Sequence, residues 1–185
     1  MKITATLYAA TRKEWREWLE ANHEREREIW LVSYRKATGR PSVPYNDAVE
    51  EALCFEWIDS TRKRIDEDRF AQRYTPRREK SPYSQLNKER LAHLILAGRV
   101  APSVLKKVRD VRVDYEIPPD ILSALKSDEK AWEFFRSTSP SYQRIRAAFV
   151  DTATQRPEEF EKRLRHLVAK SAQGRQFGYG IEDYY

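Results

Sequence analysis

Residues 57–75 read WIDSTRKRIDEDRFAQRYT, and this stretch decides the fold of the first part of the chain. β-Branched and aromatic residues favour strands, and clustered acidic residues favour turns. We interpret the stretch as two strands, over residues 57–64 and 70–75, joined by an acidic turn over residues 65–68. Pro76 then ends the second strand. The sequence therefore predicts a β-hairpin.

A helix and a strand are predicted before this hairpin. Thr11 and Glu14 have the spacing of a capping box, which places a helix over residues 12–23. Residues 29–34 form a continuous apolar run, which is typical of a central strand covered on both faces. The sheet is thus expected to have helices beside it.

A second helix is predicted from Asn46, its N-cap, to near Phe55. Its apolar residues recur at helical spacing and form the inner face. The same pattern places Glu50 and Glu51 on the outer face, in contact with solvent.

The remainder of the chain is predicted to be helical. Helices begin at Ser84 and at Pro102, and residues 111–119 form an extended join that ends in two prolines. The predicted class is α+β: a small mixed or antiparallel sheet with helices over residues 1–112, then a helical module over 118–175. Residues 176–185 are expected to be a flexible tail.

Composition indicates a folded protein with a moderate positive charge. Hydrophobic residues make up 40% and charged residues 35%, with a formal net charge of +6. Such a charge favours acidic partners weakly, and ordinary soluble domains also carry it. The first residues lack the apolar stretch of a signal peptide, and no run reaches the ~20 apolar residues of a membrane span. A cytoplasmic location is expected.

The sequence does not contain the residue patterns of a nucleophilic cysteine, a metal site or a phosphate-binding loop. Cys54 lies in an apolar run near Glu56, so a small buried hydrophobe is the better interpretation than a nucleophile. The three histidines lie far apart and have no metal-ligand spacing, and the five glycines build no phosphate loop. We therefore expect neither a metal nor a cofactor.

Positive charge is concentrated beside and within the predicted hairpin. Residues 61–80 carry twice as many basic as acidic side chains: Arg62, Lys63, Arg64, Arg69, Arg73, Arg77, Arg78 and Lys80 against Asp66, Glu67, Asp68 and Glu79. Alternate residues of a strand share a face, so Arg62 and Arg64 point the same way, and Arg73 joins whichever face the register selects. Guanidinium groups beside aromatic rings suit an anionic ligand. Ion pairing that only fixes the hairpin is the competing interpretation.

Three blocks of sequence have a recognisable composition. The first is Trp18-Leu19 to Asn22-His23, followed by Trp30-Leu31. The second runs from Tyr45 through residues 48–55 and 57–60 to Thr75-Pro76-Arg77, Ser81, Ser84 and Asn87. The third runs from Ile117-Pro118-Pro119-Asp120 through Ala124-Leu125 and Phe134-Phe135 to Ser139-Pro140-Ser141.

With these blocks the chain resembles the YdeI/OmpD-associated family, also called bacteriocin-protection proteins. The resemblance implies a helical C-terminal module and a link to resistance against cationic antimicrobial peptides. It implies no established enzymatic activity. The family favours glycine where this chain has Glu56 and tryptophan where it has Tyr83.

The leading hypothesis is a non-enzymatic binding protein in envelope stress or peptide resistance, with an anionic ligand or an acidic protein as its partner. The candidate contact residues lie between 57 and 87: Trp57, Asp59, Arg62, Lys63, Arg73, Arg77, Ser81, Ser84 and Asn87. Two alternatives stay open. One is nucleic-acid binding through the basic hairpin, and the other is an enzyme with Asp59 as general base beside Ser81 or Ser84.

Overall fold

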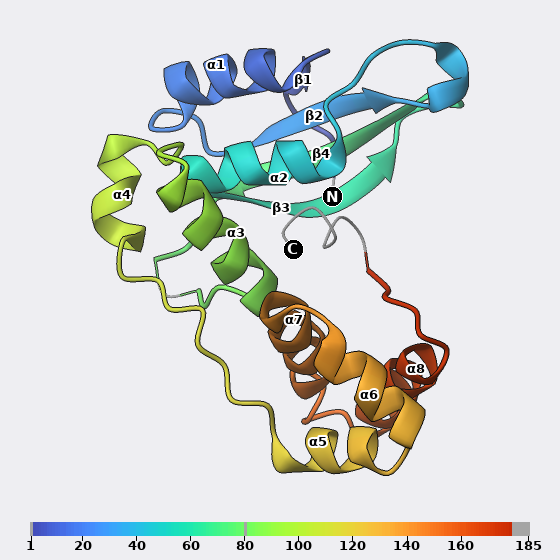
Figure 1. Cartoon of the computed structure of the whole chain (residues 1–185). Helices are drawn as coiled ribbons and strands as arrows, with labels where there is room; N and C mark the ends of the chain where they lie inside the picture. The colour runs from blue at the N-terminus through green and yellow to red at the C-terminus, as the bar shows by residue number, and fades with distance from the viewer. Residues whose placement is uncertain (1, 80, 179–185) are drawn as a thin grey trace. The chain divides into compact units, whose positions relative to one another are not determined.

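The computed structural model describes residues 2–79 and 81–178, and its chain forms two compact units (Figure 1). The first unit comprises Met1–Pro82 and His93–Val111, and the second comprises Tyr83–Ala92 and the residues from Arg112 onward. The first contains a sheet and helices, and the second is helical. The predicted α+β class is confirmed.

The first unit is built on a four-stranded mixed sheet in the order β1-β2-β4-β3. The strands are β1 (Thr6–Tyr8), β2 (Ile29–Tyr34), β3 (Trp57–Arg64) and β4 (Arg69–Pro76). β1 is parallel to β2, whereas β4 is antiparallel to both β2 and β3. The predicted hairpin and the interior position of β2 are confirmed, and β1 is a strand that sequence reasoning missed.

Two helices pack against the sheet through aromatic side chains. They are α1 (Arg12–Asn22) and α2 (Tyr45–Cys54). The ring of Trp15 in α1 lies 5.1 Å from that of Tyr74 in β4, and its indole N–H donates to the Ala48 carbonyl of α2 at 3.0 Å. Trp18 meets Trp57 edge to face at 5.8 Å. Both helices therefore pack on the sheet face that carries Tyr74 and Trp57.

The connection from α2 to β3 contains a residue in an uncommon backbone conformation. Glu56 has φ +58°, in the left-handed region that favours glycine. Its carbonyl accepts a hydrogen bond from the Arg77 N–H at 2.8 Å, which holds this turn against the end of β4. A glycine would adopt the same conformation without a side-chain penalty.

Short helices complete the first unit. The 3₁₀ turn η1 (Lys36–Thr38) follows β2, and α4 (Pro102–Val108) follows the last turn of α3 (Gln85–Leu96). The earlier part of α3 belongs to the second unit. One helix thus contributes residues to both compact units.

The second unit packs its helices around one apolar core. After the first part of α3 come α5 (Pro119–Lys126), α6 (Glu129–Ser137), α7 (Pro140–Asp151) and α8 (Pro157–Ala172). Proline at the first position starts α5, α7 and α8, while Asp128 caps α6 by accepting the Ala131 N–H at 3.0 Å. The core includes Ile121, Phe135, Tyr142, Ile145 and Leu167.

A buried carboxylate ties α3 to α7 within the second unit. Glu89 is 8% exposed and receives two hydrogen bonds from the Arg144 guanidinium, at 2.7 and 3.0 Å. Ser141 and Gln85 also donate to it, at 3.1 and 3.0 Å. Burial alone would raise the pKa of Glu89, but these donors outweigh it and hold the pKa below its ordinary value.

The predicted tail is described only over its first residues. Phe177 lies edge-on to His166, with ring centroids 4.7 Å apart, and 4.8 Å from the Arg146 guanidinium. Its N–H donates to the Tyr142 hydroxyl at 3.3 Å. Residues 179–185 of the predicted tail lie outside the described residues.

Candidate binding surface on the hairpin

The register of the sheet separates the candidate arginines. Arg62 of β3 is paired with Gln72, whereas the neighbouring Arg73 is paired with Trp30. Paired residues point to the same face and consecutive residues point to opposite faces. Arg62 therefore lies on the face of Gln72 and Phe70, and Arg73 lies on the other.

Arg73 is held in an ion pair with Glu28. The same carboxylate accepts hydrogen bonds from the Thr4 hydroxyl and from the Trp30 indole N–H, the latter at 3.1 Å. The bond from Thr4 and the partnership with Arg73 lower the pKa of Glu28. Arg73 thus ties β4 to the residue that precedes β2, an acidic partner outside the hairpin.

Arg77 is buried, with 9% of the residue exposed. Its guanidinium donates to the Ser81 carbonyl at 2.5 Å and lies 3.7 Å from the Glu56 carboxylate. These contacts close the segment after β4 onto the turn before β3. Trp57 is also buried, at 1% exposed, and its indole N–H donates to the His23 carbonyl at 3.2 Å. Arg77 and Trp57 therefore stabilise the interior of the first unit.

The other candidates occupy several local roles. Asp59 accepts the Tyr45 hydroxyl at 2.9 Å, and Lys63 is paired with Ala71, on the Arg73 face. In the second unit, Ser84 accepts the Asn87 N–H at 3.3 Å at the start of α3, and Asn87 accepts from Arg90 at 3.2 Å. Sequence adjacency had grouped these residues, but their local partners differ.

Two arginines meet one aromatic ring near the end of the hairpin. The Arg62 guanidinium carbon lies 4.4 Å from the Phe70 ring centroid, and that of Arg35 lies 5.4 Å from it. Both residues are exposed, and within the described part of the chain neither forms an ion pair. Sequence reasoning found Arg62 but missed Arg35 and Phe70, because their meeting depends on the β2–β4 register, which pairs Ser33 with Phe70.

A third arginine lies on a ring nearby. The Arg40 guanidinium lies 4.9 Å from the Tyr34 ring and donates to the Tyr34 hydroxyl at 3.0 Å. These residues line an open pocket of about 410 Å³ together with Thr38 and Asp66, Glu67, Asp68 and Arg69 of the hairpin turn. Asp66 is already bound to Arg69 at 2.6 Å. The pocket thus carries charges of both signs, whereas Arg35 and Arg62 present only positive charge.

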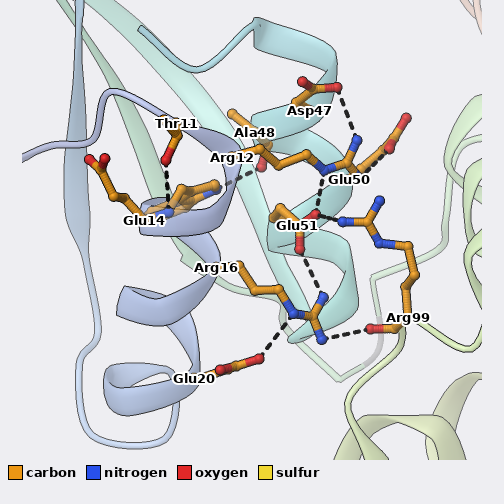
Figure 2. A network of polar contacts seen from close by, with 11 residues as sticks. Thr11, Arg12, Glu14, Arg16, Glu20, Asp47, Ala48, Glu50, Glu51 and Arg99 are labelled. Atoms are coloured by element: carbon orange, nitrogen blue, oxygen red, sulfur yellow. Dashed lines mark hydrogen bonds and ion pairs between the residues drawn. The ribbon is translucent and has the colours of Figure 1, made fainter.

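A network of polar contacts in the first unit surrounds Glu51 (Figure 2). Glu51 is 0% exposed, so the prediction that it faces solvent is wrong. Arg12 and Arg16 of α1 bind its carboxylate at 2.5 and 2.9 Å, and Arg99 binds it from the segment before α4. An acidic residue can occupy the inner face of this helix because three guanidinium groups replace its water.

The same cluster secures the surrounding chain. Arg12 also binds Asp47 at 3.0 Å and Glu50 at 2.6 Å, while Arg16 donates to the Arg99 carbonyl at 3.0 Å. Figure 2 shows the three guanidinium groups directed toward α2 from α1 and from the Arg99 segment. Because the arginines are already occupied by carboxylates, this cluster is a structural joint between α1, α2 and the segment before α4.

The residues described contain no cluster of three or more His, Cys, Asp or Glu side chains able to hold a metal ion. In the same part of the chain, no helix has the length and apolar character needed to cross a bilayer.

The structure defines a protein of the α+β class. It has an α+β unit with a basic hairpin and a helical module. The chain belongs to the family of a domain of unknown function, DUF8412, whose model matches residues 7–107, and residues 114–174 match the family described as bacteriocin-protection, YdeI or OmpD-associated. The resemblance to the YdeI/OmpD-associated family is thus confirmed over residues 114–174, which contain the third block. The first two blocks lie in the DUF8412 match. No curated protein and no solved structure matches the chain.

Proposed function

We propose that this YdeI/OmpD-associated protein is a non-enzymatic binding protein that takes an anionic ligand at the end of its β3–β4 hairpin. The supporting observation is the pair Arg35 and Arg62, two exposed guanidinium groups on the ring of Phe70 without an ion-pair partner among the described residues. Two like charges near one ring repel each other, and binding of an anion to these groups would reduce that repulsion. The proposed setting is bacterial peptide resistance or envelope stress.

The buried and paired arginines narrow the proposed surface. Arg73 has Glu28 as a partner and Arg77 is nearly covered, so their removal would disturb the fold before it disturbed a ligand. Arg35 and Arg62 can be replaced without leaving a buried carboxylate unpaired. They are therefore the residues through which binding can be tested.

The test measures binding of poly-L-glutamate and of inorganic polyphosphate to the full chain by isothermal titration calorimetry at low salt. We expect the double variant Arg35→Gln/Arg62→Gln to bind the preferred anion at least about tenfold more weakly, since each charged contact contributes roughly 1 kcal/mol. Its circular dichroism spectrum and Tm should match those of the wild type.

The matched control is Arg25→Gln/Arg27→Gln, which removes the same charge from two exposed positions outside the hairpin. Its affinity should stay within about twofold of the wild type. Equal weakening in both double variants would show that net charge alone drives binding. Absence of any binding would remove the proposed function.

The proposed setting needs a cellular measurement. A bacterial strain that lacks the gene should be more sensitive to a cationic antimicrobial peptide, and the wild-type gene should restore growth. The Arg35→Gln/Arg62→Gln gene should not restore it at equal protein level. Full rescue by that variant would show that peptide resistance does not depend on Arg35 and Arg62.

A further inference from the structure

We infer that Arg35 and Arg62 bind a linear phosphate-bearing polyanion at two points, through charge and without reading bases. This inference rests on the proposed function and names the ligand class of that same surface. Its shared chemistry is a chain of phosphate groups, which a polyphosphate or a single-stranded nucleic-acid backbone supplies.

The two arginines approach Phe70 from different strands. Arg62 belongs to β3, Arg35 directly follows β2, and Phe70 lies on β4 between these strands in the sheet. Neighbouring strands are about 4.8 Å apart, so the backbones that carry the two arginines are separated by about 10 Å. A single small anion satisfies one guanidinium more easily than both. A chain with repeated negative groups can contact the two together.

The ring holds the guanidinium groups without using their hydrogen-bond donors. An arginine over an aromatic face keeps its N–H groups in the guanidinium plane, where they remain able to bind phosphate oxygens bidentately. The Arg62 contact, at 4.4 Å to the centroid, is the closer of the two. Phe70 therefore acts as a support that orders two long side chains before the ligand arrives, which reduces the entropy lost on binding.

Three aromatic rings of β2 and β4 are poorly placed for stacking on nucleobases. Phe70 is occupied by Arg35 and Arg62, Tyr34 has Arg40 over it, and Tyr74 is 1% exposed. Proteins that bind single strands through their bases present open aromatic faces. Here the surface offers positive charge, so recognition is expected to follow the phosphates.

A folded acidic protein fits this surface less well. Protein interfaces have an apolar core with exposed large side chains at its centre. Among the described residues the exposed large hydrophobic side chains are Tyr8, Tyr45, Leu96, Leu105 and Phe149, and none of them belongs to β3 or β4. A flexible charged chain needs no such apolar centre.

The experiment compares orthophosphate, tripolyphosphate and long-chain polyphosphate as ligands of the full chain, with a mixed-sequence single-stranded DNA oligonucleotide and poly-L-glutamate beside them. We expect long-chain polyphosphate to bind at least tenfold more tightly per molecule than orthophosphate, because the second contact becomes intramolecular. The oligonucleotide should bind without preference among base compositions. Whichever of long-chain polyphosphate and the oligonucleotide binds more tightly identifies the source of the phosphate chain.

The variants test the two-point geometry. Arg35→Gln and Arg62→Gln should each weaken polyphosphate binding. For the single-stranded oligonucleotide, the double variant should reduce the magnitude of the slope of log affinity against log salt by about 1.4, as expected for two lost phosphate contacts. Phe70→Leu keeps both charges but removes their support, and it should weaken binding several-fold with an almost unchanged slope. Arg25→Gln/Arg27→Gln should leave the slope within experimental error.

The outcomes separate this inference from the proposed function. If poly-L-glutamate binds through Arg35 and Arg62 while phosphate chains do not, the inference fails and the proposed function stands. Equal affinity for orthophosphate and long-chain polyphosphate would overturn two-point binding. If none of these anions binds, both proposals fail together.

Discussion

At the scale of single residues, Cys54 is covered by the fold and is electrostatically unsuited to react. Desolvation by burial, followed by the nearby Glu51 carboxylate, raises the pKa of its thiol to about 11. Arg16 and Arg99 oppose this shift without cancelling it. The interpretation of Cys54 as a small buried hydrophobe is therefore confirmed by its position.

This environment predicts slow modification of Cys54. In the folded protein at about pH 8, reaction with Ellman's reagent should be at least about tenfold slower than in the chain unfolded by guanidinium, because little thiolate forms and access is blocked. The rate is followed by absorbance, with free cysteine as the reference. Equal rates in the folded and unfolded states would contradict the described burial.

The candidate residues show which features of a surface can be seen in the sequence and which cannot. The concentration of arginines in the hairpin was visible, and Arg62 lies on the proposed surface. The partners of Arg73 and Arg77 were not visible, since Glu28 and the Ser81 carbonyl reach them only through sheet pairing and the turn after β4. Arg35 was missed because nothing in its own segment indicates the approach to Phe70.

At the scale of elements, most helices and strands follow from their own residues. The bounds predicted for β2 and β3 agree with the structure, and the cap of α1 was predicted from Thr11. β1 was missed because a strand of three residues carries almost no periodic signal, and it is defined by pairing with β2. The outward assignment of Glu51 failed because helical periodicity treats every charged residue as exposed.

The joint between α1 and α2 predicts a large stability effect for one conservative change. Glu51→Gln removes the negative charge that three arginines bind, so their guanidinium groups lose an ion-pair partner. The free energy of unfolding, measured in urea, should therefore fall by about 3 kcal/mol. Glu17→Gln is the control, since Glu17 forms an exposed pair with Lys13 at 3.7 Å and should change stability by less than about 1 kcal/mol. Similar small effects from both changes would show that the Glu51 cluster contributes little.

At the scale of the whole molecule, the second unit carries a pH-dependent contribution to stability. The pKa of Glu89 in the folded state lies below its ordinary value of 4.5. The contribution of Glu89 to stability is therefore complete when the pH is above its pKa in the unfolded chain. It is lost as the pH falls through its pKa in the folded state. The expected window is the acidic range below 4.5.

Urea unfolding of the full chain between about pH 6 and about pH 3 measures this dependence. Wild type should lose more stability across that range than Glu89→Gln, which cannot change its charge there. Glu133→Gln replaces an exposed carboxylate of the same unit and should retain the wild-type slope. Parallel curves for wild type and Glu89→Gln would show that the Arg144 pair has no linkage to folding.

The division of α3 between the two compact units limits how the chain can be dissected. Glu89 and Gln85 are separated from their partners Arg144 and Val113 by residues 93–111, which belong to the other unit. A fragment limited to the matched residues 114–174 would keep Arg144 but lose the carboxylate that neutralises it. Neither unit can thus be released by a single cleavage of the chain, and a fragment cut at the bounds of the family match lacks part of the second unit.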